Sequence, residues 1–339
     1  MNGFLVLRKN KNLYPISMLK LVGYVLSQNM ESKEVQDLQL LRNKIDEIDD
    51  GIISLLKKRM GIINDVSHLK RNNNESFFIK SAREADMIKA LVAKVGDSIP
   101  HSIVINLWRK IISVANVKEQ DLKIAIHNPY SISDYTYLVR EYYGDIVPTY
   151  LFDSSTNIVS EMERGEIQIG IFALPGNESD FHNRKGDANE NWWMGLANNK
   201  SGLKIFAKIP FVEFQSEDKS HNQIQLVAVA QKEPERSKED VTLFYVEVEK
   251  ETSRGQILSA LKENNLQARI LKSTKLNQVE GIVFYLIEID GFYLEDDDAV
   301  RSFFKSKIKP YGKIIGHYAT PILIKKDQYI QSRLKPEPL

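Results

Sequence analysis

A long stretch of helical periodicity lies between Leu38 and Leu69. Apolar residues recur in this stretch at steps of three and four: Leu38, Leu41, Ile45, Ile48, Ile52, Leu55, Ile62, Val66 and Leu69. This rhythm predicts a long amphipathic helix that needs a partner along most of its length. Arg59 fills one slot of the rhythm. Its guanidinium must reach water or meet an anion, because a buried unpaired charge is costly.

The composition narrows the classes of function. A chain of 339 residues has room for two or three domains, and its net charge of +1 offers no general attraction for nucleic acid or for an anionic membrane. The absence of cysteine excludes disulfides and thiolate chemistry, and it fits a cytoplasmic location. The six histidines are scattered without metal-ligand spacing, so we interpret them as solvated or core residues and expect no metal.

The first 33 residues precede the predicted helical region. Lys20 interrupts the apolar run from Met18 to Leu26, which is too short to span a bilayer and lacks the unbroken core of a secretion signal. We expect residues 1–33 to be a disordered extension, or Met30 to be the true start. A targeting segment is the remaining alternative.

Three helices are predicted over residues 34–120. The first covers 34–71, the second 81–95 and the third starts after Pro100 and covers 101–119. Ser81 and Glu84 have the spacing of a capping box at the start of the second helix. This part of the chain therefore predicts an all-helical domain.

The pattern changes to α/β after Gln120. Short apolar runs at 122–126, 145–152, 167–174 and 223–230 alternate with helical segments at 133–143 and 156–164. The polar stretch 176–199 predicts a long loop in which Trp192 and Trp193 either cap a core or line a pocket.

The charged segment 232–240 predicts a linker. Residues 241–325 then follow the order β-α-β-β-α-β of a ferredoxin-like domain, and residues 326–339 form a tail.

Four cations in the helical region share a geometric relation. Arg59 and Lys70 project from about the same helix face roughly 16 Å apart, whereas Arg42 lies about 25 Å before Arg59. If two such helices pair antiparallel, Arg42 of one copy approaches Arg59 and Lys70 of the other. With Arg83, this cluster suits a small molecule with two carboxylates. The alternative is that Arg59 reaches water or sets the pairing register, and that the other three are solvated surface charges.

The segments LLRNKIDEIDDGIISLLKKRMGIINDVSHLKR, AREADMIKAL and LWRKIISVANVKEQ resemble the all-helical chorismate mutase family from Leu40 to about Gln120. The resemblance implies a dimeric long-helix bundle that rearranges chorismate to prephenate without a cofactor. Residue by residue, it implies that Arg42 crosses to the partner's site, that Arg59 and Arg83 hold carboxylates, and that Lys70 donates to the ether oxygen. It also implies that Glu84 holds the substrate hydroxyl.

Three positions depart from the commonest family pattern. Lys80 stands where aspartate is frequent, Ala115 where serine is frequent, and Glu119 where many members carry glutamine. The first two changes imply fewer contacts to the hydroxyl and the carboxylate of the substrate. Glu119 can donate a hydrogen bond to the ether oxygen only when protonated, so we expect activity to fall as the pH rises.

The remaining chain resembles a prephenate dehydratase domain from Leu122 to about Ala230 and an ACT regulatory domain from Val241 to about Ile324. Together these resemblances imply an α + α/β multidomain fold: a mutase helix bundle, a periplasmic-binding-protein-like α/β region and a ferredoxin-like ACT domain.

The chemistry-bearing motifs of these two families are altered. The dehydratase Thr-Arg-Phe motif aligns with 221–226, its Pro-Ile-Glu-Asn-Ser segment with 174–179 and its glycine-rich opening with 127–131. The ACT Glu-Ser-Arg-Pro motif reads Lys-Ser-Thr-Lys at 272–275. We infer that dehydration and ordinary phenylalanine feedback are lost.

The leading hypothesis is a cytoplasmic homodimeric chorismate mutase with a degenerate dehydratase-like part. It binds no nucleic acid and no membrane. The alternatives are a bifunctional mutase–dehydratase, a lyase of the same helical fold that acts on isochorismate, and a noncatalytic amino-acid sensor whose helices only dimerise.

Overall fold

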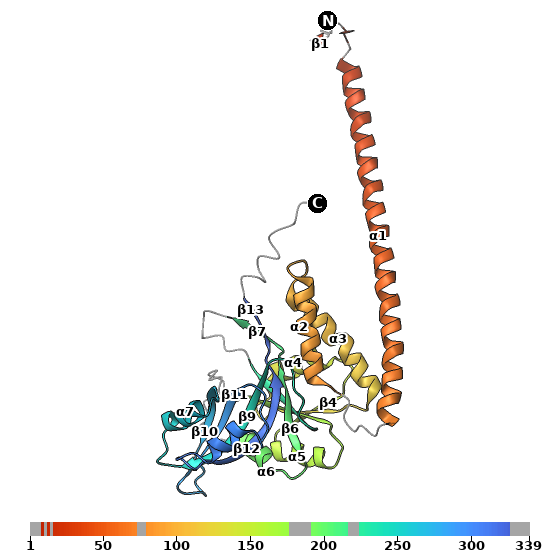
Figure 1. Ribbon diagram of the computed structural model, residues 1–339. Helices are drawn as coiled ribbons and strands as arrows, with labels where there is room; N and C mark the ends of the chain where they lie inside the picture. The colour runs from red at the N-terminus through yellow and green to blue at the C-terminus, as the bar shows by residue number, and fades with distance from the viewer. Residues whose placement is uncertain are drawn as a thin grey trace. The chain divides into compact units, whose positions relative to one another are not determined.

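The computed structural model describes residues 8–9, 12–13, 16–72, 79–175, 191–215 and 224–325 (Figure 1). It describes side chains at 33, 35–69, 79–175, 191–213 and 224–324. The chain divides into two compact parts, 1–66 and 67–339, and each is described by itself. No helix in the described ranges combines the length and the apolar character needed to cross a membrane.

Helix α1 (Ile16–Asn72) dominates the first part of the chain, where the short strands β1 (Arg8–Lys9) and β2 (Asn12–Leu13) form an antiparallel pair. The helix begins well before residue 34, so the expectation of a disordered extension over 1–33 is wrong from Ile16 onward. The physical reason is that a helix, once nucleated, propagates at little cost through a segment without proline. The apolar stripe predicted on this helix is uncovered: Leu38, Leu41, Ile45, Ile48, Ile52, Leu55, Ile62 and Leu69 are 48% to 66% exposed.

Helices α2 (Ser81–Val95) and α3 (His101–Glu119) have the bounds that the periodicity predicts. The predicted capping box at the start of α2 is wrong. Lys80 is the N-cap residue, and no side-chain cap hydrogen bond forms. The Ser81 hydroxyl instead donates to the carbonyl oxygen of Phe206 at 2.9 Å. The hydroxyl therefore ties α2 to a strand of the sheet.

One sheet of nine strands runs through the described portion of the second part (Figure 1). Its strand order is β10-β11-β9-β12-β6-β8-β5-β3-β4. The strands are β3 (Ile124–His127), β4 (Thr149–Phe152), β5 (Ile169–Ala173), β6 (Leu203–Ile209), β8 (Leu226–Gln231), β9 (Asp240–Glu249), β10 (Ala268–Thr274), β11 (Ile282–Asp290) and β12 (Tyr311–Ala319). A separate parallel pair joins β7 (Val212–Gln215) to β13 (Ile322–Lys325).

The half of the sheet made by β4, β3, β5, β8 and β6 belongs to the α/β region. Strand β3 is parallel to β4 and β5, and β8 is antiparallel to both β5 and β6. Helices α4 (Ser133–Tyr143) and α5 (Ser155–Glu163) lie where the periodicity predicts them. The periodicity does not predict β6, β7 or β13.

The other half of the sheet shows the ferredoxin-like order of elements. Strand β9 is followed by α7 (Arg254–Glu263), β10, β11, α8 (Asp298–Phe304) and β12. Strand β12 pairs with β9 on one side and with β6 on the other, where Gly316 faces Ile205. A Cβ atom at Gly316 would lie 2.3 Å from the Ile205 carbonyl oxygen, so glycine is required where the two halves meet.

Helix α6 (Trp192–Asn198) lies within the stretch that the sequence predicts as loop, and this prediction is wrong for 192–198. Both Trp192 and Trp193 are buried. The Trp192 indole donates to the Ala173 carbonyl oxygen at 2.8 Å and stacks on Phe172. Burial of two large aromatic side chains therefore outweighs the polar composition of the surrounding segment.

Helices α2 and α3 share a hydrophobic core with the α/β region. Ile88 of α2 and Ile105 and Ile112 of α3 lie in the same cluster as Ile124 of β3 and Phe211. The second and third predicted mutase helices therefore fold against the sheet region.

Candidate active site

Three candidate residues, Arg42, Arg59 and Lys70, lie on helix α1. Arg42 is exposed and Arg59 is half-buried. Lys70 belongs to α1, but its side chain lies outside the described residues. Arg42 and Arg59 lie on the same helix as the uncovered apolar stripe, so these cations accompany a surface that is suited to a partner.

The remaining candidate residues lie on α2 and α3 in the second part. At the start of α2, the Lys80 ammonium lies 3.5 Å from Oε1 of Glu235, and Arg83 is exposed. The Glu84 side chain is only 12% exposed. On α3, Ala115 and Glu119 are both buried.

Glu84 has two partners on α3 that the sequence analysis does not identify. Nη1 of Arg109 donates to Oε2 of Glu84 at 3.1 Å, and Nδ2 of Asn116 donates to Oε1 at 3.3 Å. Arg109 follows Ile105 and precedes Ile112 at helical spacing, so it interrupts an apolar face as Arg59 does. That interruption is the signal that points to Arg109.

Aromatic rings enclose the Arg109 guanidinium. Its central carbon lies 4.0 Å from the centre of the Tyr142 ring and 4.8 Å from that of the Phe211 ring. Burial raises the pKa of the Tyr142 hydroxyl, and the positive charge of Arg109 opposes this rise. Burial also raises the pKa of the neighbouring Tyr143 well above its ordinary value. Arg109 therefore sits in a dry, aromatic environment.

The linker between β8 and β9 fastens the start of α2. The Lys232 ammonium donates to the Ile79 carbonyl oxygen at 3.0 Å and lies 3.2 Å from Oε2 of Glu235. Burial lowers the pKa of Lys232, and Glu235 partly offsets this effect. The same carboxylate group thus contacts both Lys232 and Lys80.

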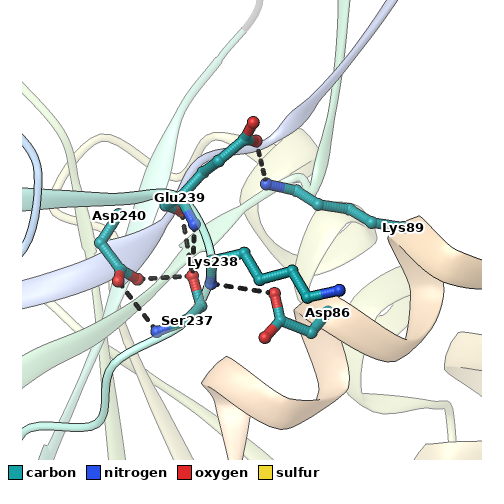
Figure 2. A network of polar contacts seen from close by, with 6 residues as sticks. All are labelled: Asp86, Lys89, Ser237, Lys238, Glu239 and Asp240. Atoms are coloured by element: carbon teal, nitrogen blue, oxygen red, sulfur yellow. Dashed lines mark hydrogen bonds and ion pairs between the residues drawn. The ribbon is translucent and has the colours of Figure 1, made fainter.

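Figure 2 shows the next contacts along this linker. The Lys238 backbone N–H donates to Oδ1 of Asp86 at 3.1 Å, and the Lys89 ammonium donates to Oε2 of Glu239 at 2.8 Å. Asp240 accepts from the hydroxyl and the backbone N–H of Ser237, which fixes the turn that leads into β9. Helix α2 is therefore connected by side chains to the start of the ferredoxin-like half.

Only part of the altered dehydratase motifs is described. His127 and Asn128 are buried, and the Asn128 side chain closes the following loop through two hydrogen bonds with the backbone of Ile132. Gln225 donates to Glu213 at 2.8 Å. The positions 176–179 and 221–223 lie outside the described residues.

The family model described as chorismate mutase type II matches residues 41–120. No curated protein matches the sequence.

Three solved structures are similar to the chain. The first is described as GqqA, a novel type of quorum quenching acylase, with 16% identity and a TM-score of 0.41, and the match covers 59% of this chain and 96% of that one. The prephenate dehydratase from Streptococcus mutans has 13% identity and a TM-score of 0.40, with 60% and 99% covered. The prephenate dehydratase in complex with L-Phe from Arthrobacter aurescens has 13% identity and a TM-score of 0.41, with 63% and 100% covered.

The family match spans the segment that carries Arg42, Arg59, Lys70, Arg83 and Glu84. It begins on α1 and ends directly after α3, at Gln120. This chain therefore carries a domain of the chorismate mutase type II family at residues 41–120.

Proposed function

We propose that the protein converts chorismate to prephenate. The match of residues 41–120 to the chorismate mutase type II family is the observation that carries this proposal. The residue types agree with it, because a substrate that carries two carboxylates and a hydroxyl is suited by the four cations Arg42, Arg59, Lys70 and Arg83 and the acid Glu84.

The reaction requires little chemistry from the protein. One C–O bond breaks and one C–C bond forms within a single molecule, so no atom, proton or electron enters or leaves. The protein must hold the dianion in its compact conformation, and Arg59 and Arg83 are the proposed carboxylate clamps. It must also stabilise the negative charge that develops on the ether oxygen, for which Lys70 and protonated Glu119 are the proposed donors. Glu84 accepts from the substrate hydroxyl.

We propose further that two copies of the chain share each site. The uncovered apolar stripe of α1 supports this proposal, since such a stripe favours burial against another helix. On α3, Ile103, Leu107 and Val114 form a second exposed apolar row. In this arrangement, Arg42 of one copy enters the site built around Arg59 of the other.

The region 121–231 is proposed to lack dehydratase activity, and 241–325 to be an ACT-like domain without the ordinary phenylalanine response. The supporting observation is the replacement of the family's threonine, arginine and glutamate motifs in this sequence. An isoleucine or an asparagine at those positions cannot replace a proton donor or a carboxylate in the reaction.

The test is loss of chorismate with the purified full chain, followed by identification of the product. Wild type is compared with Arg59→Ala and with Lys58→Ala, in which an exposed neighbouring cation on α1 is removed. We expect prephenate as the product, a loss of about 100-fold in kcat/KM for Arg59→Ala because a charged clamp is removed, and wild-type rates for Lys58→Ala. An inactive wild type would refute the mutase proposal, and phenylpyruvate as product would refute the loss of dehydration.

A further inference from the structure

Arg109 is a buried cation whose partners come from three separate segments. Its side chain is 4% exposed, and it contacts Glu84 of α2, Tyr142 of α4 and Phe211 between β6 and β7. Tyr142 and Phe211 lie outside the matched segment 41–120. The α/β region therefore supplies both aromatic walls around a cation of the mutase domain.

Glu84 is the acid that balances this cation. Among the described residues, Nε and Nη2 of Arg109 have no hydrogen-bond acceptor, and the single ion pair of its guanidinium is with Glu84. A buried guanidinium is stable only when paired, so Arg109 strongly restrains the position of the Glu84 carboxylate. The tight enclosure by two rings in turn restrains the guanidinium.

The Glu84 carboxylate keeps capacity for another donor. A carboxylate has about four lone-pair sites, and the protein contacts described above use two of them, one from Arg109 and one from Asn116. The side chain is also partly accessible, at 12% exposed, in contrast to Arg109. This arrangement holds the acid in one orientation while leaving it able to accept from a hydroxyl.

We propose that Arg109 is a positioning residue that fixes Glu84 for the substrate hydroxyl, and that Tyr142 and Phe211 of the α/β region hold Arg109 in place. This inference rests on the proposed mutase function and on the role of Glu84 in it. It also gives the α/β region a role in mutase activity, because the enclosure of Arg109 is incomplete without it.

The test is a double-mutant cycle in the full chain with Arg109→Lys, Glu84→Gln and the double variant. Lysine keeps the charge but loses the planar fork that fixes the carboxylate. Because a contact to the hydroxyl is made in both ground and transition state, Arg109→Lys is expected to raise KM about tenfold with kcat within about twofold of wild type. In the Glu84→Gln background, the same change is expected to alter KM by less than about twofold.

Lys110→Ala is the matched control, since this exposed neighbour on α3 contacts Asp145 and the Arg140 carbonyl. It is expected to leave both constants unchanged. A merely structural Arg109 would lower the amount of folded enzyme, which reduces apparent kcat and leaves KM unchanged. That result, or equal KM increases in both backgrounds, would overturn the proposal.

A second variant keeps the test decisive if Arg109→Lys does not fold. Phe211→Leu removes one ring while preserving an apolar side chain outside the mutase domain. This variant is expected to raise KM about threefold, because one cation–π contact is lost. In the Glu84→Gln background, the same change is expected to leave KM unchanged. An unchanged KM in a folded Phe211→Leu protein would contradict the proposal. If the wild type does not convert chorismate, both the proposed function and this inference fail. If the wild type is active but the effects of the variants on KM add to that of Glu84→Gln, only the positioning role is refuted.

Discussion

At the residue scale, several residues with a proposed functional role are charged side chains on apolar helix faces. Arg59 interrupts the stripe of α1, and Arg109 interrupts the face of α3 that packs into the core. Glu119 is a third case, because it is a buried acid at the last residue of α3, where the helix dipole disfavours a negative charge. A charged group at each of these positions needs a partner or a ligand to stabilise it.

Glu119 is a proposed donor to the ether oxygen. A glutamine amide can donate at the same place, whereas alanine offers no donor. Glu119→Gln is therefore expected to keep kcat/KM close to that of the wild type, and Glu119→Ala to lower it about 100-fold. Chorismate loss measured with both variants checks the prediction. Equal kcat/KM values for the two variants would contradict it.

The sequence predicts some elements well and others poorly, for physical reasons. The bounds of α2, α3 and α4 follow from local periodicity and match the structure. Strands β6, β7 and β13 escape prediction because their identity depends on pairing with distant segments, such as β12 for β6. In the candidate site, Arg59 and Glu84 are predicted from sequence. Arg109 is missed, because its partners Glu84 and Tyr142 lie 25 and 33 residues away on other helices.

Strand β12 carries a buried histidine that predicts how stability depends on pH. Nε2 of His317 lies 2.6 Å from the Tyr293 carbonyl oxygen, and the ring stacks on Phe292. Burial lowers the pKa of His317 below its ordinary value of 6.5, although this hydrogen bond and the nearby Asp240 oppose the shift. As the pH falls below about 6.5, the unfolded chain takes up the proton first, so the free energy of unfolding must decrease.

Urea unfolding at pH 7.5 and 5.5 measures this effect. The wild type is expected to lose more stability between the two values than His317→Gln, whose amide can donate to Tyr293 but does not titrate. Lys313→Gln, an exchange at a charged residue of the same strand, serves as the control and should keep the wild-type difference. Equal losses in wild type and His317→Gln would show that His317 does not cause the dependence.

At the scale of the whole molecule, two features distinguish the second part of the chain. The α/β half and the ferredoxin-like half share one sheet through β12 and β6, and α2 and α3 belong to the same core as the α/β half. The β-α-β-β-α-β order of the ferredoxin-like half can be predicted from the sequence. The joined sheet cannot, because it depends on the close approach of Gly316 to Ile205, which no local pattern encodes. The candidate substrate-binding residues on α2 are thus part of the larger folded part, while Arg42 and Arg59 lie on the long helix.

The proposed sharing of each site between two copies of the chain can be tested by complementation. Arg42→Ala and Arg59→Ala chains are co-expressed with different tags, and the mixed dimer is purified. If each site takes Arg42 from one copy and Arg59 from the other, the mixed dimer retains one intact site of two, and about half of the wild-type activity is expected. A dimer of Arg59→Ala with the Arg42→Ala/Arg59→Ala double variant has no intact site and provides the baseline. If each site instead takes both arginines from one copy, both sites of the mixed dimer are damaged. Activity at the baseline would therefore refute a shared site, even where each homodimer is folded and the wild type is active.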